Sequence, residues 1–214
     1  MTPREHDDLR PEPVRGLPEN LPEGEEILWQ GAPDWWLLAK EALSLYWVAG
    51  YFLFLFAWRT ISGAAVETWA DSANAASFFL ALGGIVCALL ILIAILQARS
   101  TVYTLTSRRV AMRIGAALTM TLNLPFRRIA NATLAVRPDG SGTIALELMP
   151  DGMQFSYAMA WPHVRPWRMH RTRPALRCIP EAAKVAALLA EAAETAVNEP
   201  VVSALRPSDA VAAK

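Results

Sequence analysis

The sequence predicts a membrane protein of mixed α and β structure, in which a two-helix transmembrane hairpin precedes an antiparallel β-barrel or curved sheet with a C-terminal helix. Three observations lead to this prediction. No charged side chain lies between Asp71 and Arg99. After Arg99, apolar residues recur at every second position in several short stretches, which is typical of strands. Near the end, residues 180–197 repeat apolar residues at helical spacing, which is typical of an amphipathic helix.

The formal net charge of zero conceals an uneven charge distribution. Residues 1–42 carry four basic and ten acidic side chains, whereas residues 99–177 carry twelve arginines against three acidic side chains. The chain is 54% hydrophobic over 214 residues, which is high for a soluble protein of this size. We therefore expect an acidic arm, a membrane segment and a basic domain beside the membrane.

The region before the membrane segment divides into two parts. Residues 1–22 combine prolines and charges with few large apolar side chains, so we expect a disordered arm. Residues 23–41 are predicted to be a pre-membrane interfacial segment with a short strand or turn, followed by a helix that Asp34 caps. That helix begins at the paired Trp35 and Trp36, and tryptophan is enriched where a membrane meets water.

The hairpin is expected over residues 42–98, with helices at about 42–58 and 76–97. At 1.5 Å per residue, about 20 apolar residues cross a hydrocarbon core of roughly 30 Å. The second helix meets this length, and the first is at the short limit. We favour spanning over an in-plane position for the first helix because it is apolar on all faces. Residues 59–75 would form a short polar connection.

The distribution of basic residues predicts the orientation of the hairpin. The connection holds one basic residue, Arg59, whereas Lys40 and Arg99 flank the hairpin. Because basic residues accumulate on the cytoplasmic side, both termini are expected in the cytoplasm. The first hydrophobic segment begins only near residue 42, so we expect no cleavable signal peptide. The predicted location is the bacterial inner membrane, with a multi-pass topology.

Small residues form a stripe on the second helix and predict a helix-packing face. Their spacing places them on one side of the helix, and they are Ser77, Ala81, Gly84 and Ala88. We favour packing against Gly50 and Ala57 of the first helix over contact with another protein, because every hairpin needs such a face.

The domain after the membrane is expected over residues 99–197, with a disordered tail over 198–214. Strands are predicted at 102–106, 110–114, 117–124, 129–136, 143–148 and 154–161, with a turn at 138–142,. The terminal helix would cover the sheet with one apolar face, made of Val185, Leu188, Leu189, Ala192 and Ala196,. Six or seven strands closed by one C-terminal helix are the outline of a pleckstrin-homology-like (PH-like) domain.

Several segments of the sequence resemble those of a known family. Residues 103–115, YTLTSRRVAMRIG, and residues 24–33, GEEILWQGAP, are similar to bacterial PH-like membrane proteins. Together with TLNLPFRRIANATLAV at 121–136 and the arginine- and proline-rich stretch from 161 to 190, they resemble the PuhB family. The resemblance covers residues 24 to about 195.

The resemblance implies a non-catalytic assembly factor for the photosynthetic reaction centre and its light-harvesting 1 complex in the intracytoplasmic membrane of purple bacteria. The expected partners are reaction-centre subunits or light-harvesting 1 polypeptides, and no cofactor is expected. The alternative is a general PH-like membrane module that binds anionic lipid or another membrane protein and has no role in photosynthesis. Self-association is a further possible contact.

The stretch over residues 161–180 is the main candidate for contact with partners. It holds four prolines, two tryptophans and five arginines, so we expect an extended crossing without regular helix or central strand. Tryptophan and arginine dominate binding hot spots, and arginine also attracts anionic lipid. Solvated arginines around packed tryptophans are the alternative. The candidate contacts are Trp161, Arg165, Trp167 and Arg168, with Arg108, Arg109, Arg127 and Arg128 as additions to one basic patch.

Other function classes find little support in the sequence. There is no phosphate-binding glycine loop, nucleophile elbow or HExxH pattern,, so we expect no enzyme and no metal. Cys87 and Cys178 lie in different parts of the chain and are not expected to pair. His163 and His170 lie outside the membrane helices, which argues against axial ligation of bacteriochlorophyll and favours structural or surface roles. Nucleic acid is not expected as a partner, since lipid is the simpler anionic partner of a membrane-tethered basic domain.

Overall fold

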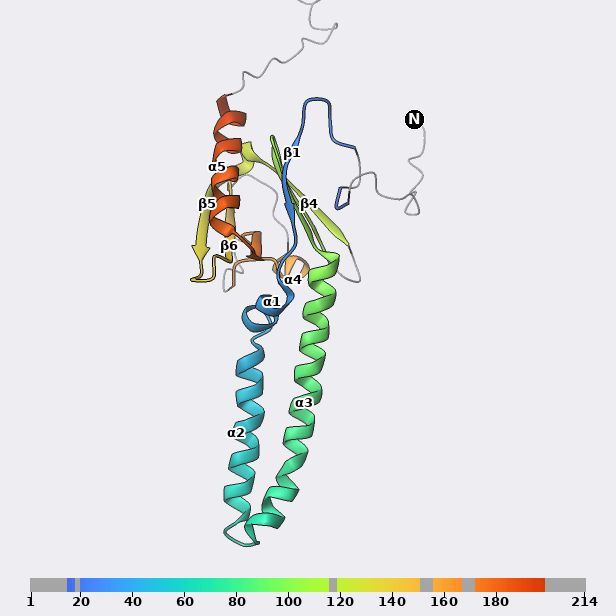
Figure 1. The fold of residues 1–214 in the computed structure, drawn as a ribbon, viewed down its shortest axis with the longest axis vertical. Coiled ribbons are helices and arrows are strands. Elements are labelled where there is room, and N and C mark those ends of the chain that lie inside the picture. Colours follow the sequence, from blue (N-terminus) through green and yellow to red (C-terminus); the bar gives the residue numbers. More distant parts are fainter. Residues whose placement is uncertain (1–14, 18–19, 116–118, 151–155, 167–171, 199–214) are drawn as a thin grey trace, which may run out of the picture.

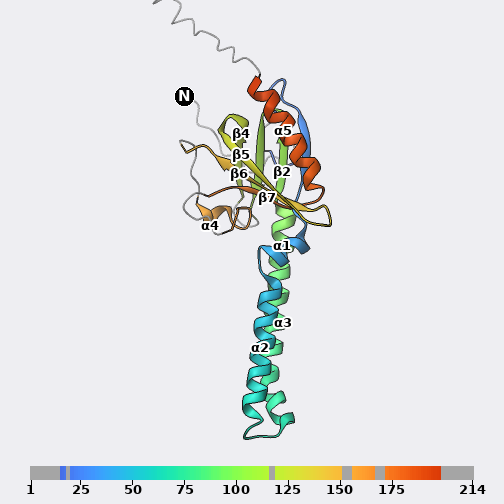
Figure 2. The same cartoon turned by 90° about the vertical axis from the view of Figure 1, so that its left-hand side faces the viewer.

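A computed structural model describes residues 15–17, 20–115, 119–150, 156–166 and 172–198 (Figure 1). Two long helices, α2 (Leu45–Gly63) and α3 (Trp69–Ser100), lie side by side and form a stalk. The strands and the last helix gather at the end of the stalk where α2 begins and α3 ends (Figures 1 and 2). A short helix, α1 (Trp35–Glu41), lies between the sheets and α2.

Helices α1 and α3 start at caps that the sequence provides. The Leu37 amide donates to Oδ1 of Asp34 at 2.8 Å, so Asp34 caps α1 as expected. At the far end of the stalk, the Asp71 amide donates to the Thr68 hydroxyl at 3.3 Å, and α3 begins there. The connection between α2 and α3 is therefore much shorter than the predicted 59–75. Hydropathy marks the apolar part of a helix, whereas backbone hydrogen bonding continues to the cap.

Helix α3 is, among the described helices, the one that by itself is long and apolar enough to cross a membrane. Helices α1 and α2 meet the combined requirement of length and apolar composition only as a pair, and they are bent by 53° at the break between them. Ser44, in this break, has a left-handed backbone with φ of 55°. The first predicted helix, at about 42–58, thus corresponds to α2 and the break before it, and α2 qualifies as a possible span only together with α1.

Helix packing in the stalk uses a different glycine from the predicted one. A Cβ added to Gly83 would lie 2.7 Å from Cβ of Phe52 on α2, so the two backbones approach closely there. A Cβ on Gly84 or on Gly50 would meet nothing within 4 Å. The predicted stripe, Ser77, Ala81, Gly84 and Ala88, is exposed along its length. The expectation that it packs against the first helix is wrong, because α3 is rotated so that Gly83 faces α2.

The strands form two antiparallel sheets that are not closed into a barrel. The first sheet has the order β1 (Ile27–Gly31), β2 (Val102–Thr106), β3 (Arg109–Ile114) and β4 (Met120–Pro125). The second has the order β5 (Ile129–Val136), β6 (Gly142–Leu148) and β7 (Ala175–Ile179). A short 3-10 helix, η1 (Phe126–Arg128), links the two sheets.

Three elements around the sheets differ from the prediction. The segment before the stalk supplies β1, which pairs with β2, so the folded domain includes residues that were expected only at the membrane interface. A short helix, α4 (Tyr157–Ala160), occupies half of the expected strand at 154–161, and residues 154 and 155 lie outside the described residues. Strand β7 lies within the stretch expected to be an irregular crossing, and Pro174 and Pro180 bound it. Proline is compatible with the ends and edges of sheets, which is where this strand lies.

The last helix, α5 (Ala182–Asn198), covers the sheets through the expected face. Val185, Leu189 and Ala192 are buried in the main core, which Tyr103, Leu105, Val110 and Leu146 of the sheets help to form. Leu188 and Ala196 pack at its margin. Removal of this apolar surface from water stabilises the domain at roughly 25 cal/mol per Å². The core therefore joins both sheets to the C-terminal helix.

Candidate functional site

The predicted basic patch is divided between the two ends of the domain. Strand β2 begins directly after α3, so Arg108, which follows β2, lies at the end remote from the stalk. The Phe126 amide donates to the Arg108 carbonyl at 3.2 Å, which places η1 with Arg127 and Arg128 at the same remote end. Trp161 and Arg165 lie near the stalk, beside the end of α3. The described members of the predicted patch therefore lie at opposite ends of the domain, because antiparallel pairing separates them.

At the remote end, Arg109 has a structural partner. Its Nε donates to Oε1 of the buried Glu25 at 2.7 Å, and the Thr106 hydroxyl donates to the same oxygen at 2.7 Å. Arg109 thus anchors the chain before β1. Arg108, Arg127 and Arg128 are exposed and form the remote arginine group.

At the stalk end, exposed aromatic and apolar side chains surround the junction between helices and sheets. Trp35 and Trp36 of α1 are 42% and 38% exposed, and Trp161 after α4 is 40% exposed. Lys40 lies 5.5 Å from the ring centroid of Trp36. Helices α1 and α4 lie at the same level along the molecule (Figures 1 and 2). Exposed tryptophans at this level suit either a membrane interface or a partner protein.

Two of the predicted contacts at this end can be placed and two cannot. Arg165 is half-buried, and its backbone amide donates to the Arg173 carbonyl at 3.0 Å. Trp167 and Arg168 lie outside the described residues, as does His170. We call the exposed set Trp35, Trp36, Met159 and Trp161 the junction surface.

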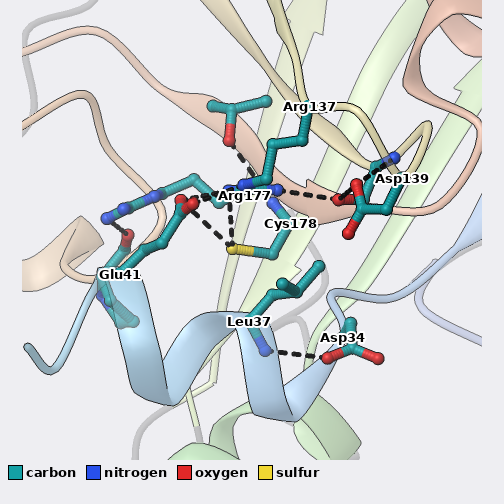
Figure 3. Close-up of polar contacts among 10 residues, drawn as sticks. Asp34, Leu37, Glu41, Arg137, Asp139, Arg177 and Cys178 are labelled. Carbon is teal, nitrogen blue, oxygen red and sulfur yellow. Dashed lines mark hydrogen bonds and ion pairs between the residues drawn. The ribbon is translucent and has the colours of Figure 1, made fainter. Parts of the chain in front are cut away.

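A charged network fixes α1 to the second sheet (Figure 3). Arg137, at the end of β5, forms an ion pair with Glu41 at the end of α1, and its NH1 donates to the Ser141 hydroxyl at 2.9 Å. The Asp34 amide donates to the Cys178 carbonyl at 2.8 Å. Both ends of α1 are thus bound to the second sheet, which restricts movement of the sheets relative to the stalk.

The thiol of Cys178 lies within this network. Its sulfur is 4.0 Å from the Arg137 guanidinium and 4.0 Å from Oε2 of Glu41. Burial raises the pKa of the Cys178 thiol, and the charge of Arg177 opposes this effect. The group is therefore a protonated, buried thiol rather than a reactive thiolate.

His163 ties the end of α3 to the segment after α4. Its Nε2 lies 3.1 Å from the Thr101 hydroxyl, at the C-cap of α3, and its Nδ1 lies 2.6 Å from the Tyr103 hydroxyl. Burial lowers the pKa of His163 to about 3, and the charge of Arg177 adds to this effect. The neutral ring thus joins two elements, which agrees with the structural role expected for it.

The junction has the chemistry of a binding surface. Among the described residues, no three His, Cys, Asp or Glu side chains come close enough to hold a metal ion. The polar groups at the junction bind one another and fix its geometry, while the exposed groups are mainly aromatic and apolar. Rigid support beneath exposed aromatic side chains is typical of protein recognition.

Sequence reasoning missed the polar residues that support this surface. Glu41, Arg137 and Cys178 come from three distant parts of the chain, and no local pattern connects them. The turn at 138–142 was predicted, and the Gly140 amide does donate to the Arg137 carbonyl at 3.0 Å. The turn signal therefore places Arg137 at a strand end, but only the tertiary fold brings Glu41 to it.

Comparison with known proteins agrees with this architecture. The model of the family described as bacterial PH domain matches residues 45–193. A protein of Rhodobacter capsulatus, described as an uncharacterized 23.7 kDa protein in the puhA 5′ region, is 48% identical over 207 residues, which cover 94% of each chain. No solved structure matches. These matches confirm the resemblance to PuhB, and the chain belongs to the bacterial PH domain family.

Proposed function

We propose that this protein is a non-catalytic assembly factor for the photosynthetic reaction centre and its light-harvesting 1 complex. The observation that carries the proposal is the relative from Rhodobacter capsulatus, which matches over almost the whole chain and is described by its place in the puhA 5′ region. That region belongs to the puh operon, which encodes reaction-centre genes. A factor needed when a membrane complex forms is expected beside the genes of that complex.

The membrane arrangement is part of this proposal. Helix α3 crosses the bacterial inner membrane, and α2, which precedes it in the chain, lies beside it. Helix α1 lies at the interface between membrane and water. Exposed Trp47 near the start of α2 and exposed Trp58 and Trp69 near the other end of the stalk support this position, because tryptophan favours both interfaces. The basic residues that flank the stalk favour a cytoplasmic position of both termini and of the sheets.

Partners would bind at the junction surface. The aromatic side chains of the junction surface are exposed at the level where a membrane-bound partner leaves the membrane. The junction surface can therefore contact both the membrane part and the cytoplasmic part of that partner. The bonds of Arg137 and His163 hold the sheets in a fixed position relative to the stalk. A preorganised surface loses less entropy on binding than a mobile one.

Affinity purification of the full-length tagged protein from mildly solubilised membranes tests this proposal. We expect reaction-centre or light-harvesting 1 polypeptides to co-purify with the wild type. Trp161→Ala should reduce their recovery by about tenfold, because buried interface tryptophans contribute on the order of 1.4 kcal/mol or more. Met149→Ala is the matched control, since Met149 is an apolar residue that is 47% exposed and whose amide donates to the Arg128 carbonyl at the end of the domain remote from the stalk.

The alternative function, a general module for anionic lipid, has less support. Arg108, Arg127 and Arg128 lie at the end of the domain remote from the stalk, so they do not face the membrane that the stalk enters. Purification that recovers anionic lipid but no photosynthetic polypeptide, with Trp161→Ala unchanged, would favour this alternative and contradict the proposed role.

A further inference from the structure

Strand β5 has an open edge. In the second sheet it pairs with β6 on one side only, and no other backbone hydrogen bond reaches residues 130–136 from the described part of the chain. Alternate residues of an antiparallel strand direct their N–H and C=O groups away from the paired neighbour. The outer edge of β5 therefore presents a row of donors and acceptors to which a further strand can bind.

The other edge of the same sheet is covered. Along β7, the Ala175 amide donates to the His163 carbonyl at 2.9 Å, and the Asp34 amide donates to the Cys178 carbonyl at 2.8 Å. The Arg177 amide donates to the Tyr103 hydroxyl at 3.4 Å. The sheet thus has one edge joined to the rest of the molecule and one edge that is available.

Strand β5 also lacks most features that protect natural edges. Its eight residues, IANATLAV, contain no charge, no proline and no glycine, and every side chain from 130 to 136 is exposed. Exposed edges are usually short, charged, interrupted or covered, because an unprotected edge pairs with other chains. The one interruption is a shift in register between Ile129 and Asn131. The composition of β5 therefore favours pairing of its outer edge with another strand over exposure of that edge to water.

An apolar groove of about 280 Å³ lies between β5 and α5. Phe126, Ile129 and Ile144 contribute to it from the sheet side, and Leu189 and Ala193 contribute from α5. Figure 1 shows α5 running alongside β5. Side chains alternate along a strand, so a strand added at β5 would direct every second side chain toward this groove. The groove selects apolar side chains at those positions.

Charge distinguishes the two ends of the groove. The exposed Arg127 and Arg128 directly precede β5, at the end remote from the stalk. At the stalk end, the guanidinium of Arg137 is already paired with Glu41. Among the described residues that flank β5, Arg127 and Arg128 thus carry positive charge that no acidic side chain pairs with, and they lie at the remote end. This charge complements acidic residues of an incoming segment.

We propose that β5 and α5 form a strand-addition site for an extended, apolar segment of another protein, whose acidic end binds beside Arg127 and Arg128. Backbone hydrogen bonds to the edge would supply affinity, and the groove and the arginines would supply specificity and direction. This site is separate from the junction surface, and the proposal holds whether or not the partner belongs to photosynthesis.

Peptide binding to the full-length protein in detergent tests the proposal. The probes share an uncharged core of alternating valine and threonine and carry a pair of either glutamates or lysines, placed at one terminus or the other. We expect a glutamate peptide to bind about tenfold more tightly than its lysine counterpart. In the Arg127→Glu/Arg128→Glu variant, the preference should reverse, so that the lysine peptide binds more tightly.

A matched pair of threonine variants tests the strand edge itself. Thr133 on β5 and Thr121 on β4 are both exposed residues of edge strands, one in each sheet. Thr133→Glu should weaken binding of the glutamate peptide about tenfold, whereas Thr121→Glu should leave it unchanged. Thermal unfolding of both variants checks that the domain is folded.

Several results would overturn the proposal. These are no binding of any peptide, equal binding of the glutamate and lysine peptides, or equal weakening by the two threonine variants. Binding that appears only after residues 199–214 are removed would assign the edge to the chain's own tail. A wild-type dimer that Thr133→Glu converts to a monomer would assign it to a second copy.

Discussion

At the scale of single residues, buried polar side chains determine how the sheets join the stalk. His163 can be buried because both of its ring nitrogens lie within hydrogen-bonding distance of hydroxyl groups, those of Thr101 and Tyr103. Its neutral form fits this site, whereas its charged form would bring a positive charge into a buried position beside Arg177. The side chain that connects α3 to the domain therefore also makes the connection sensitive to acid.

The free energy of unfolding should fall as the pH decreases from 6.5 toward about 3. In this window the unfolded chain, with an ordinary histidine pKa of 6.5, binds a proton that folded His163, with its pKa of about 3, does not bind. The unfolded state then holds more protons, so stability rises with pH and is lost on acidification. At about pH 5 the loss should reach roughly 2 kcal/mol, measured by thermal or urea unfolding.

His163→Gln is the control for this prediction, because glutamine is polar but does not titrate. Carboxylates titrate mainly below about pH 4.5, so the interval between about pH 6.5 and 5 isolates histidine. His6 and His170 are present in both proteins. An equal slope in the wild type and in His163→Gln would show that His163 is not the cause.

At the scale of elements, adjacent glycines on α3 have opposite environments. Gly83 contacts α2 at Phe52, whereas Gly84 faces outward with Ser77, Ala81 and Ala88. The sequence contains both glycines, and its small-residue spacing fits the outward set. Rotation of a helix about its axis depends on the neighbouring helix, so spacing alone could not choose between the two faces.

Gly83→Leu should destabilise the stalk, and Gly84→Leu should not. A side chain at Gly83 would overlap Phe52 and force α2 and α3 apart, at a cost of about 1–3 kcal/mol, or more for so large a residue. A Cβ at Gly84 meets no atom of the described residues within 4 Å. Unfolding in detergent measures both effects. Equal stability of the two variants would contradict the packing described here.

The outward stripe stays a predicted contact for another membrane protein. Because Gly84→Leu should leave the stalk folded, the effect of this variant on co-purification of photosynthetic polypeptides tests the contact separately. Normal co-purification would remove the stripe from the candidate sites.

At the scale of the whole molecule, the sequence predicts the class of architecture but not how its parts are joined. Strong local patterns predicted the apolar α3, the Asp34 cap and the apolar face of α5. Long-range pairing decided the rest. Strand β1 precedes the stalk in sequence but joins a sheet whose other strands follow it. Arg127 and Arg128 were expected in one patch with Arg165, but they lie at the opposite end of the domain from it. Residue patterns report neighbours along the chain, whereas these features depend on neighbours in space.

The most direct test of the proposed function is the near-infrared absorbance of membranes from a strain that lacks this gene. We expect the absorbance of the reaction centre and light-harvesting 1 complex to be severalfold lower in this deletion strain than in the wild type. Complementation with the wild-type gene or with Met149→Ala should restore it, and Trp161→Ala should restore it only in part. Normal absorbance of both complexes in the deletion strain would contradict the account.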